Sequence, residues 1–189
     1  MSGKRFSNVI GFDDTPFAHG YTGPVKIVGT VFAQTRFNGV LIGDVQKDGS
    51  DAAVQLIDLI GNSKFYENLQ LIMLQGIAFG GFNVIDVFQL HHALGLPVLV
   101  VARRQPDMAA VREALLTRIP QGAAKWAIIQ RLGPMEAADH VFVQRVGLDL
   151  EQATAVVRQF ALHGHIPEPL RTAHLIGGAL SDGQSRGRT

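Results

Sequence analysis

Apolar residues fall into two patterns that take turns along the chain: short runs of strand length, and stripes at helical spacing. Nearly continuous apolar runs at 69–74 and 97–102 are typical of strands buried on both faces of a sheet. Three earlier stretches rich in β-branched residues, 7–12, 25–33 and 39–46, predict an antiparallel meander. The sequence therefore predicts a mixed sheet that begins antiparallel and continues parallel.

Helical spacing of apolar residues appears after the meander and between the later strands. Asn38-Gly39 is a favourable hairpin turn between the second and third strands. Ser50 or Asp51 is placed to cap a helix at 52–60, and Asn83 to cap one that runs to Leu94. The alternation at 140–146 predicts an edge strand. Further helices are expected at 107–118, 123–132, 150–162 and from Pro167 to Leu180.

This order of elements is that of the ribonuclease H-like fold, an α/β mixed sheet flanked by helices. We expect a single domain over residues 1–180 and a polar tail at 181–189, since no linker or repeat interrupts the chain. In that topology the carboxyl end of the first strand lies beside that of the fourth. Asp13 and Asp14 follow the first strand, and Gln75 follows the fourth. Chemistry is expected at this edge.

Composition narrows the class of protein. Hydrophobic residues make up 47% and charged residues 17% of the 189, which favours a folded globule. The formal net charge of +1 means that nucleic acid must be bound through a local patch. Without cysteine, thiolate metal sites and thiol nucleophiles are excluded. No signal peptide or apolar run of about 20 residues is present, so we expect a cytoplasmic protein with no membrane partner.

Paired carboxylates are the principal candidates for chemistry. If the first strand includes Asp13 and Asp14, their side chains point to opposite faces; if it has ended, Asp14 can form a turn before Thr15-Pro16. Two neighbouring acids form a site that Mg²⁺ would stabilise. Asp48 and Asp51 are either helix-start residues or further oxygen ligands brought to the same edge.

Other polar and aromatic residues are candidates for binding nucleic acid. Phe17 follows the acids and is either a stacking surface for a base or a core residue. Gly80 and Gly81 allow close approach of a DNA strand or close backbone packing, and they match no nucleotide-binding fingerprint. A local basic patch for phosphate contacts is expected from Arg103, Arg104, Arg171, His174 and Arg186.

Five segments resemble one known family. They are Gly11–Asp14, the turn at 48–52, the block Gly76–Asp86, the segment Ile166–His174 and the closing Gly183–Arg188. They are similar to domain-of-unknown-function family ninety-nine, endonuclease V-like nucleases of the endonuclease dU type. The resemblance implies a Mg²⁺- or Mn²⁺-dependent endonuclease that cleaves DNA containing uracil or hypoxanthine, with a role in DNA repair. It implies that Asp13, with Asp14 and Asp48 or Asp51, holds the metal.

Gln75 departs from the family pattern. Many members of the family that this chain resembles have Leu-Asp-Gly where this chain has Leu74-Gln75-Gly76, so an amide replaces the expected acid. Glutamine offers an oxygen without the charge that attracts a hard cation. Two hypotheses follow: a nuclease in which Gln75 completes the pocket, and a nucleic-acid-binding protein that has lost catalysis through Gln75. A scaffold protein without DNA affinity is a third. The sequence leaves the oligomeric state open.

Overall fold

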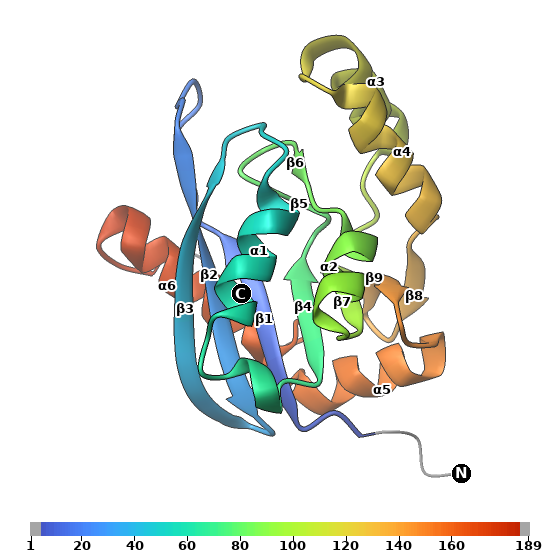
Figure 1. Ribbon diagram of the computed structural model, residues 1–189. Helices are drawn as coiled ribbons and strands as arrows, with labels where there is room; N and C mark the ends of the chain where they lie inside the picture. The colour runs from blue at the N-terminus through green and yellow to red at the C-terminus, as the bar shows by residue number, and fades with distance from the viewer. Residues whose placement is uncertain (1–4, 186–189) are drawn as a thin grey trace.

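A mixed sheet of seven strands runs through the centre of the molecule (Figure 1). The computed structural model describes residues 5–185. The strands of the sheet are β1 (Asn8–Asp14), β2 (Pro24–Ala33), β3 (Arg36–Gln46), β4 (Leu71–Gln75), β7 (Val98–Ala102), β8 (Glu136–Ala138) and β9 (Val141–Val146). Their order is β3-β2-β1-β4-β7-β9-β8. β1 pairs antiparallel with β2 and parallel with β4, and β4 is parallel to β7, so the predicted meander and parallel strands are both present.

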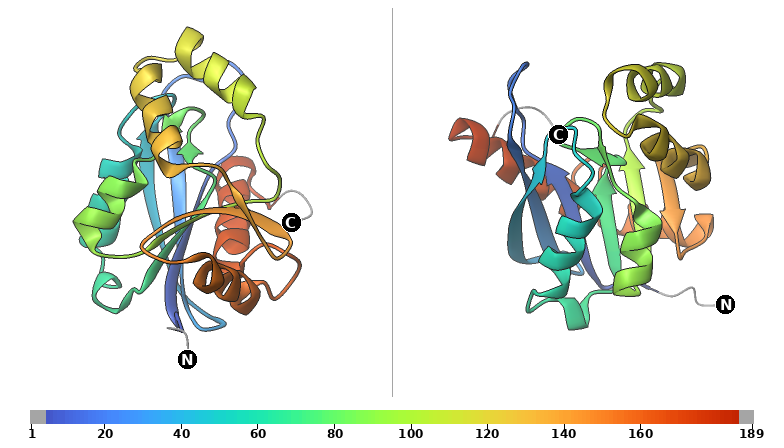
Figure 2. Two further views of the ribbon diagram at one scale, coloured as in Figure 1. Left: turned by 90° about the vertical axis from the view of Figure 1, so that its right-hand side faces the viewer. Right: turned by 45° about the horizontal axis from the view of Figure 1, so that its top comes forward.

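Helices cover both faces of this sheet. The two turned views show α1 and α2 on one face and α5 and α6 on the other, while α3 and α4 form an arm beyond one end of the strands (Figures 1 and 2). A small hairpin, β5 with β6, and a short 3₁₀ helix, η1, complete the fold. Their bounds are α1 (Ala52–Gly61), η1 (Tyr66–Asn68), β5 (Ala78–Phe79), β6 (Asn83–Val84), α2 (Val87–Leu94), α3 (Met108–Arg118), α4 (Gly122–Leu132), α5 (Leu150–Phe160) and α6 (Glu168–Asp182).

The alternation of side chains along β1 divides the core into two parts. Ile10 and Phe12 pack with residues of α1 and α2, whereas Val9 packs with residues of α5 and α6. β4 is buried on both faces from Leu71 to Leu74, as its apolar run predicted. A third cluster joins the arm to the small hairpin through Val84, Leu115 and Ile129. β1 is therefore fixed from both faces at the place where its two acids lie.

The prediction that the β2–β3 turn lies at Asn38-Gly39 is wrong. The β2–β3 turn lies at Gln34-Thr35, where Gln34 has a φ of 54°, and Ala33 pairs with Arg36 on either side. Gly39 lies inside β3, and a Cβ there would collide with the ring of Phe65. The glycine thus permits close packing of an aromatic ring against the strand, a requirement that the local sequence does not distinguish from a turn.

Asn83 does not cap the helix that follows it. α2 begins at Val87, and Asp86 caps it by accepting from the N–H groups of Phe88 and Gln89. Asn83 is buried and caps α1 from outside, since its Oδ1 accepts from Ala52 N at 3.0 Å. Asp51 holds the N-cap position of α1 without making that bond.

The strand at 140–146 is also not an edge. β8, which is too short to give a sequence pattern, pairs with β9 and lies outside it. At the other end of the chain, α6 continues to Asp182 and includes two residues that were assigned to the tail. The last four residues of that tail, 186–189, lie outside the described residues, and the predicted phosphate-binding Arg186 is one of them.

Among residues 5–185, no helix has both the length and the apolar character that a membrane-spanning helix needs.

Candidate active site

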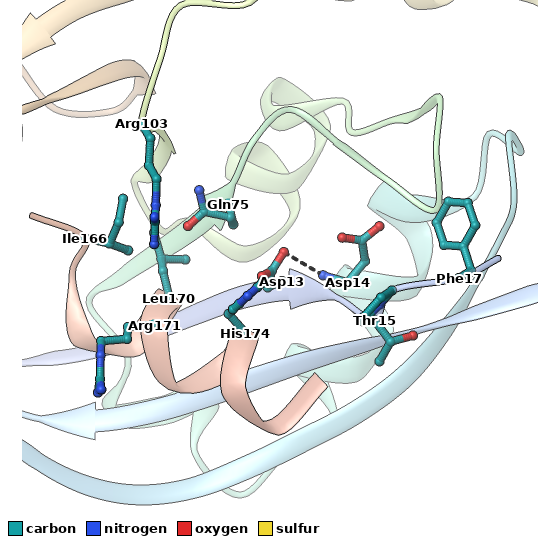
Figure 3. A pocket seen from close by; sticks show the side chains of 11 residues that line it. Asp13, Asp14, Thr15, Phe17, Gln75, Arg103, Ile166, Leu170, Arg171 and His174 are labelled. Carbon is teal, nitrogen blue, oxygen red and sulfur yellow. Dashed lines mark hydrogen bonds and ion pairs between the residues drawn. The ribbon is translucent and has the colours of Figure 1, made fainter. Parts of the chain in front are cut away.

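Asp13 and Asp14 are the last two residues of β1, and their side chains point to opposite faces of the sheet. Asp13 is buried, and its Oδ2 lies 2.9 Å from His174 Nδ1 on α6. Asp14 turns the other way, where its Oδ2 accepts from Gly80 N at 2.7 Å. Asp14 N in turn donates to Asp13 Oδ1 at 2.9 Å (Figure 3). The strand therefore continues through both acids, which decides between the two arrangements that the sequence left open.

The position of His174 depends on how closely α6 approaches β1. A Cβ on Gly11 would lie 2.6 Å from Pro169 Cβ and 2.9 Å from Leu170 N, so glycine lets the start of the helix rest on the strand. Thr30 Oγ1 on β2 donates to Pro169 O at 2.6 Å and holds the helix start there. One turn later, His174 lies over Asp13.

Replacing Gly11 with alanine is expected to destabilise the protein by ~1–3 kcal/mol, because the new methyl group meets helix backbone that cannot yield without moving α6. Urea unfolding monitored by circular dichroism measures the change. Gly61→Ala is the matched control, since a Cβ there meets only Leu94 Cδ2 at 3.6 Å. Equal unfolding midpoints for the two variants would contradict the role assigned to Gly11.

A buried carboxylate orients one of the pocket's arginines. Glu168, the first residue of α6, is 7% exposed, and its two oxygens lie 3.3 Å from Arg171 Nη1 and 3.0 Å from His163 Nδ1. Arg171 is half-buried and lines the same pocket as Asp13. The Glu168 carboxylate thus limits the positions that the Arg171 guanidinium can take.

The parallel strands β4 and β7 bring a second pair of side chains to the pocket. Gln75 ends β4, and its Nε2 donates to Val101 O at 3.4 Å. Arg103 follows the last residue of β7, and its side chain lines the same pocket (Figure 3). The end of the sheet therefore combines acids from one strand with an amide and a cation from its neighbours.

These side chains enclose a pocket of about 560 Å³. Its wall combines acidic, basic, amide and apolar groups (Figure 3). The lining residues are Asp13, Asp14, Thr15, Pro16, Phe17, Gln75, Arg103, Ile166, Leu170, Arg171 and His174. A second hollow, of about 400 Å³, shares Thr15, Pro16 and Phe17 with the first and adds Tyr21 and Leu180.

Charges in the pocket change the protonation of two of its groups. Burial, and then the charge of Asp13, raise the pKa of Asp14 to about 6, although the Gly80 N–H opposes the change. The hydrogen bond to Asp13 raises the pKa of His174, against burial and the charge of Arg103. The carboxylates of Asp13 and Asp14 thus repel one another when both are ionised, and a bound cation would reduce that repulsion.

The oxygen donors of the pocket fit a divalent cation held jointly with substrate. The two carboxylates of Asp13 and Asp14 and the amide oxygen of Gln75 are hard ligands of the kind that Mg²⁺ and Mn²⁺ prefer. Within residues 5–185, no group of three or more histidine, cysteine or acidic side chains is placed to hold a metal. A cation bound here would complete its coordination with water and a phosphate oxygen, as Mg²⁺ commonly does.

The structure brings together some of the predicted residues and not others. Asp13, Asp14, Gln75, Phe17, Arg103, Arg171 and His174 line one pocket. Arg104 is exposed and does not line it. Gly80 contributes its N–H to Asp14, and Gly81 is required because a Cβ there would collide with Asp48 Oδ1. Both glycines therefore serve backbone packing in the described structure.

Asp48 and Asp51 do not line the pocket, and both bind backbone close to the small hairpin. Asp48 Oδ1 accepts from Phe82 N at 2.8 Å. Asp51 Oδ1 accepts from Gln46 N at 3.1 Å and from Asn83 Nδ2 at 2.6 Å. Asp51 occupies the N-cap position of α1 without a capping bond, and both carboxylates bind the end of β3 or the small hairpin.

Two residues near the site were not identified from the sequence. Glu168 stands between two prolines, and that spacing gave no sign of its pairing with Arg171. Lys125 is 3% exposed and donates to Asp48 O at 2.7 Å. The one available signal for Lys125 is that it stands within the run 123–129, whose other residues are all apolar.

Comparison with known proteins identifies the family. The sequence pattern of the family described as Endonuclease dU matches residues 5–181. The chain belongs to the endonuclease dU family. A UPF0215 protein of Deinococcus radiodurans is 49% identical to it over 184 residues, which cover 97% of this chain and 94% of the relative. A UPF0215 protein of Methanothermobacter thermautotrophicus is 39% identical over 188 residues, covering 97% and 92%.

Solved structures confirm the predicted fold class of this endonuclease dU family member. A protein of unknown function from Archaeoglobus fulgidus superposes with a TM-score of 0.85 at 30% identity, covering 92% of this chain and 97% of that one. Endonuclease V of Ciona intestinalis, in complex with a 24mer DNA that contains an inosine followed by a ribo-adenosine, gives 0.61 at 15% identity, with coverage of 95% and 87%. The sheet and helices are thus those of the ribonuclease H-like fold.

Proposed function

We propose that this member of the endonuclease dU family is a divalent-metal-dependent endonuclease that cleaves DNA containing deaminated bases. The observation that carries the proposal is the pairing of Asp13 and Asp14 in one pocket with Arg103, Arg171 and His174. Acids that can hold a cation and side chains that can neutralise a phosphate then face the same space. The family description supports uracil, and the inosine-containing DNA bound by the Ciona enzyme supports hypoxanthine.

The basic and acidic residues of the pocket would have different roles. Arg103 and Arg171 would bind phosphate oxygens, with Glu168 fixing the direction of Arg171. Asp13 and Asp14, with the amide oxygen of Gln75, would hold Mg²⁺ or Mn²⁺. When bound, the cation supplies Lewis-acid stabilisation of the phosphate and a water of lowered pKa. His174 keeps Asp13 in place through its Nδ1, and Phe17 offers a face on which a base can stack.

Nicking of labelled duplexes tests the proposal. Duplexes that contain uracil or hypoxanthine should be cut when Mg²⁺ or Mn²⁺ is present and left intact in a chelator, while an undamaged duplex should be cut at a much lower rate. Equal rates on damaged and undamaged strands would reject the substrate class. Activity in the chelator would reject the metal.

Gln75 supports a second candidate, a DNA-binding protein without catalysis. Its amide nitrogen donates to Val101 O, and the side chain brings no negative charge to the pocket that Asp13 and Asp14 line. Under this candidate DNA binding persists and weakens steeply with salt, while no metal restores cleavage.

Replacing Gln75 with aspartate is expected to tighten Mn²⁺ binding at least about tenfold. A unit charge about 4 Å from another contributes roughly 4 kcal/mol at a protein surface, from which repulsion by Asp13 and Asp14 subtracts a part. Isothermal titration in the absence of DNA measures the affinity. Gln89→Asp on the exposed part of α2 is the control and should match the wild type. A Gln75→Asp variant with unchanged affinity would show that position 75 does not face the cation.

A further inference from the structure

A continuous line of hydrogen bonds connects the arm to Asp14. Lys125 Nζ on α4 donates to Asp48 O at 2.7 Å. Asp48 N donates to Gly80 O at 2.8 Å, and Gly80 N donates to Asp14 Oδ2 at 2.7 Å. Three hydrogen bonds thus join four segments that are far apart in the sequence, and the last bond is made to a carboxylate of the pocket.

Lys125 is an unusual residue for this place. Its side chain is 3% exposed, so its ammonium group is removed from water, and this burial lowers its pKa while the charge of Asp48 acts in the opposite direction. A buried ammonium needs acceptors, and its hydrogen bond is made to the main chain of Asp48. The lysine therefore holds a backbone segment in place.

The segment that it holds has a constrained conformation. Asp48 has a φ of 54°, in the left-handed region that residues other than glycine seldom adopt. In this conformation its carbonyl binds Lys125, its N–H binds Gly80 and its Oδ1 binds Phe82 N at 2.8 Å. Asp48 is clamped to the small hairpin from both sides of Gly81 and cannot shift without moving the hairpin.

Gly80 transmits this constraint to the pocket. Its carbonyl accepts a hydrogen bond from Asp48 N, and its own N–H donates to the Asp14 carboxylate. The arm also packs on the same hairpin through Leu115, Ile129 and Val84, so apolar contacts join the two elements beside the hydrogen bonds. Losing the bond to Asp48 would release Gly80 and, with it, the direction of the Asp14 carboxylate.

We propose that Lys125 and Asp48 are positioning residues. Through the backbone C=O and N–H of Gly80, they fix the Asp14 carboxylate in the geometry that binds the cation. The proposal rests on the proposed function in that it takes Asp14 as a metal-binding group. It assigns Asp48 a role through the backbone, distinct from the ligand role expected from the sequence.

Hydrogen exchange at the Gly80 amide in metal-free protein, followed by NMR, tests the positioning itself. Lys125→Met keeps the length of the side chain and removes the ammonium, and it should speed exchange at Gly80 at least tenfold. The Ile72 amide in the sheet should be unchanged, as should both amides in the control Lys64→Met, which alters an exposed lysine. Gly80 exchange at the wild-type rate in Lys125→Met would overturn the proposal.

Two variants of Asp48 keep the test decisive if Lys125→Met unfolds the arm. Asparagine tolerates a positive φ and retains an oxygen for Phe82 N, whereas alanine does neither. Asp48→Ala should therefore speed Gly80 exchange much more than Asp48→Asn does. Equal rates in the two variants would overturn the role of Asp48.

Mn²⁺ affinity and kinetics supply the functional readout. Lys125→Met should weaken Mn²⁺ binding about fivefold or more and lower kcat, with KM for DNA unchanged because Lys125 lies outside the pocket. Combined with Asp14→Asn it should add no further loss. A fall in thermal stability with unchanged Mn²⁺ affinity would mean a purely structural role. A wild type that neither binds Mn²⁺ nor nicks DNA would reject the proposed function, and Gly80 exchange would still decide the positioning.

Discussion

Replacing Asp13 with asparagine is expected to reduce the rate of nicking of uracil-containing DNA by roughly 10³-fold or more. Asp13 is 6% exposed and lies where the two halves of the site meet, with Asp14 N on one oxygen and His174 Nδ1 on the other. Asparagine keeps the shape of the side chain and removes the charge, so the loss would report on the charge itself. Single-turnover nicking assays at saturating Mn²⁺ measure it.

The comparison for Asp13→Asn is Asp44→Asn, which removes an exposed carboxylate of β3 paired with Lys26. That variant should nick at the wild-type rate, because an exposed ion pair outside the main pocket contributes little. Both variants should unfold at urea concentrations close to that of the wild type. An Asp13→Asn protein that keeps more than a tenth of the activity would remove Asp13 from the reaction and reject the proposed mechanism.

Replacing Asp14 with asparagine is expected to stabilise the metal-free protein at pH 8 by up to about 3 kcal/mol, while weakening Mn²⁺ binding. The folded protein holds the pKa of Asp14 at about 6, above the ordinary value of 3.8. An upward change of about two units corresponds to about 3 kcal/mol. Burying an ionised carboxylate beside Asp13 thus costs stability that asparagine, which can still accept from Gly80 N, does not lose.

The dependence on pH has a definite sign. Between pH 3.8 and about 6 the folded state keeps the Asp14 proton that the unfolded state has lost, so the free energy of unfolding falls as pH rises. Above about pH 6, Asp14 is ionised in the folded state as well, and the free energy of unfolding is lowered by the full amount. Urea unfolding in a chelator should therefore show Asp14→Asn more stable than wild type at pH 8, with about half of that difference at pH 5 and little of it below pH 3.8. Asp44→Asn should show no such difference.

Added Mn²⁺ should reverse the order of stability. Metal that binds only the folded state stabilises it in proportion to its affinity, so the wild type should gain more than Asp14→Asn. If Asp14→Asn is less stable than wild type at pH 8 in the chelator, the carboxylate is not strained and the case for a cation at this place is lost. Higher stability of Asp14→Asn in the chelator, reversed by Mn²⁺, would link the function of the site to its local instability.

The sequence by itself determined the antiparallel meander and the two buried parallel strands of the sheet. Buried strands must present continuous apolar runs, and helices between them must present stripes, because each pattern follows from the direction of successive side chains. Those local rules correctly predicted β4, β7 and the meander, and the ribonuclease H-like topology that this order indicated brings Asp13, Asp14 and Gln75 to one edge of the sheet.

Only the tertiary structure decided which polar residues serve the pocket and which serve the backbone. Gly39 resembles a turn residue and instead makes room for Phe65; Asn83 resembles a cap for its own helix and instead caps α1. Asp48 and Asp13 are both acids near a strand end, yet the first binds the hairpin and the second faces the pocket. Such choices depend on partners distant in the sequence. A hydrogen bond between residues 14 and 80, or between 48 and 125, is set by how the elements pack, which no local pattern records.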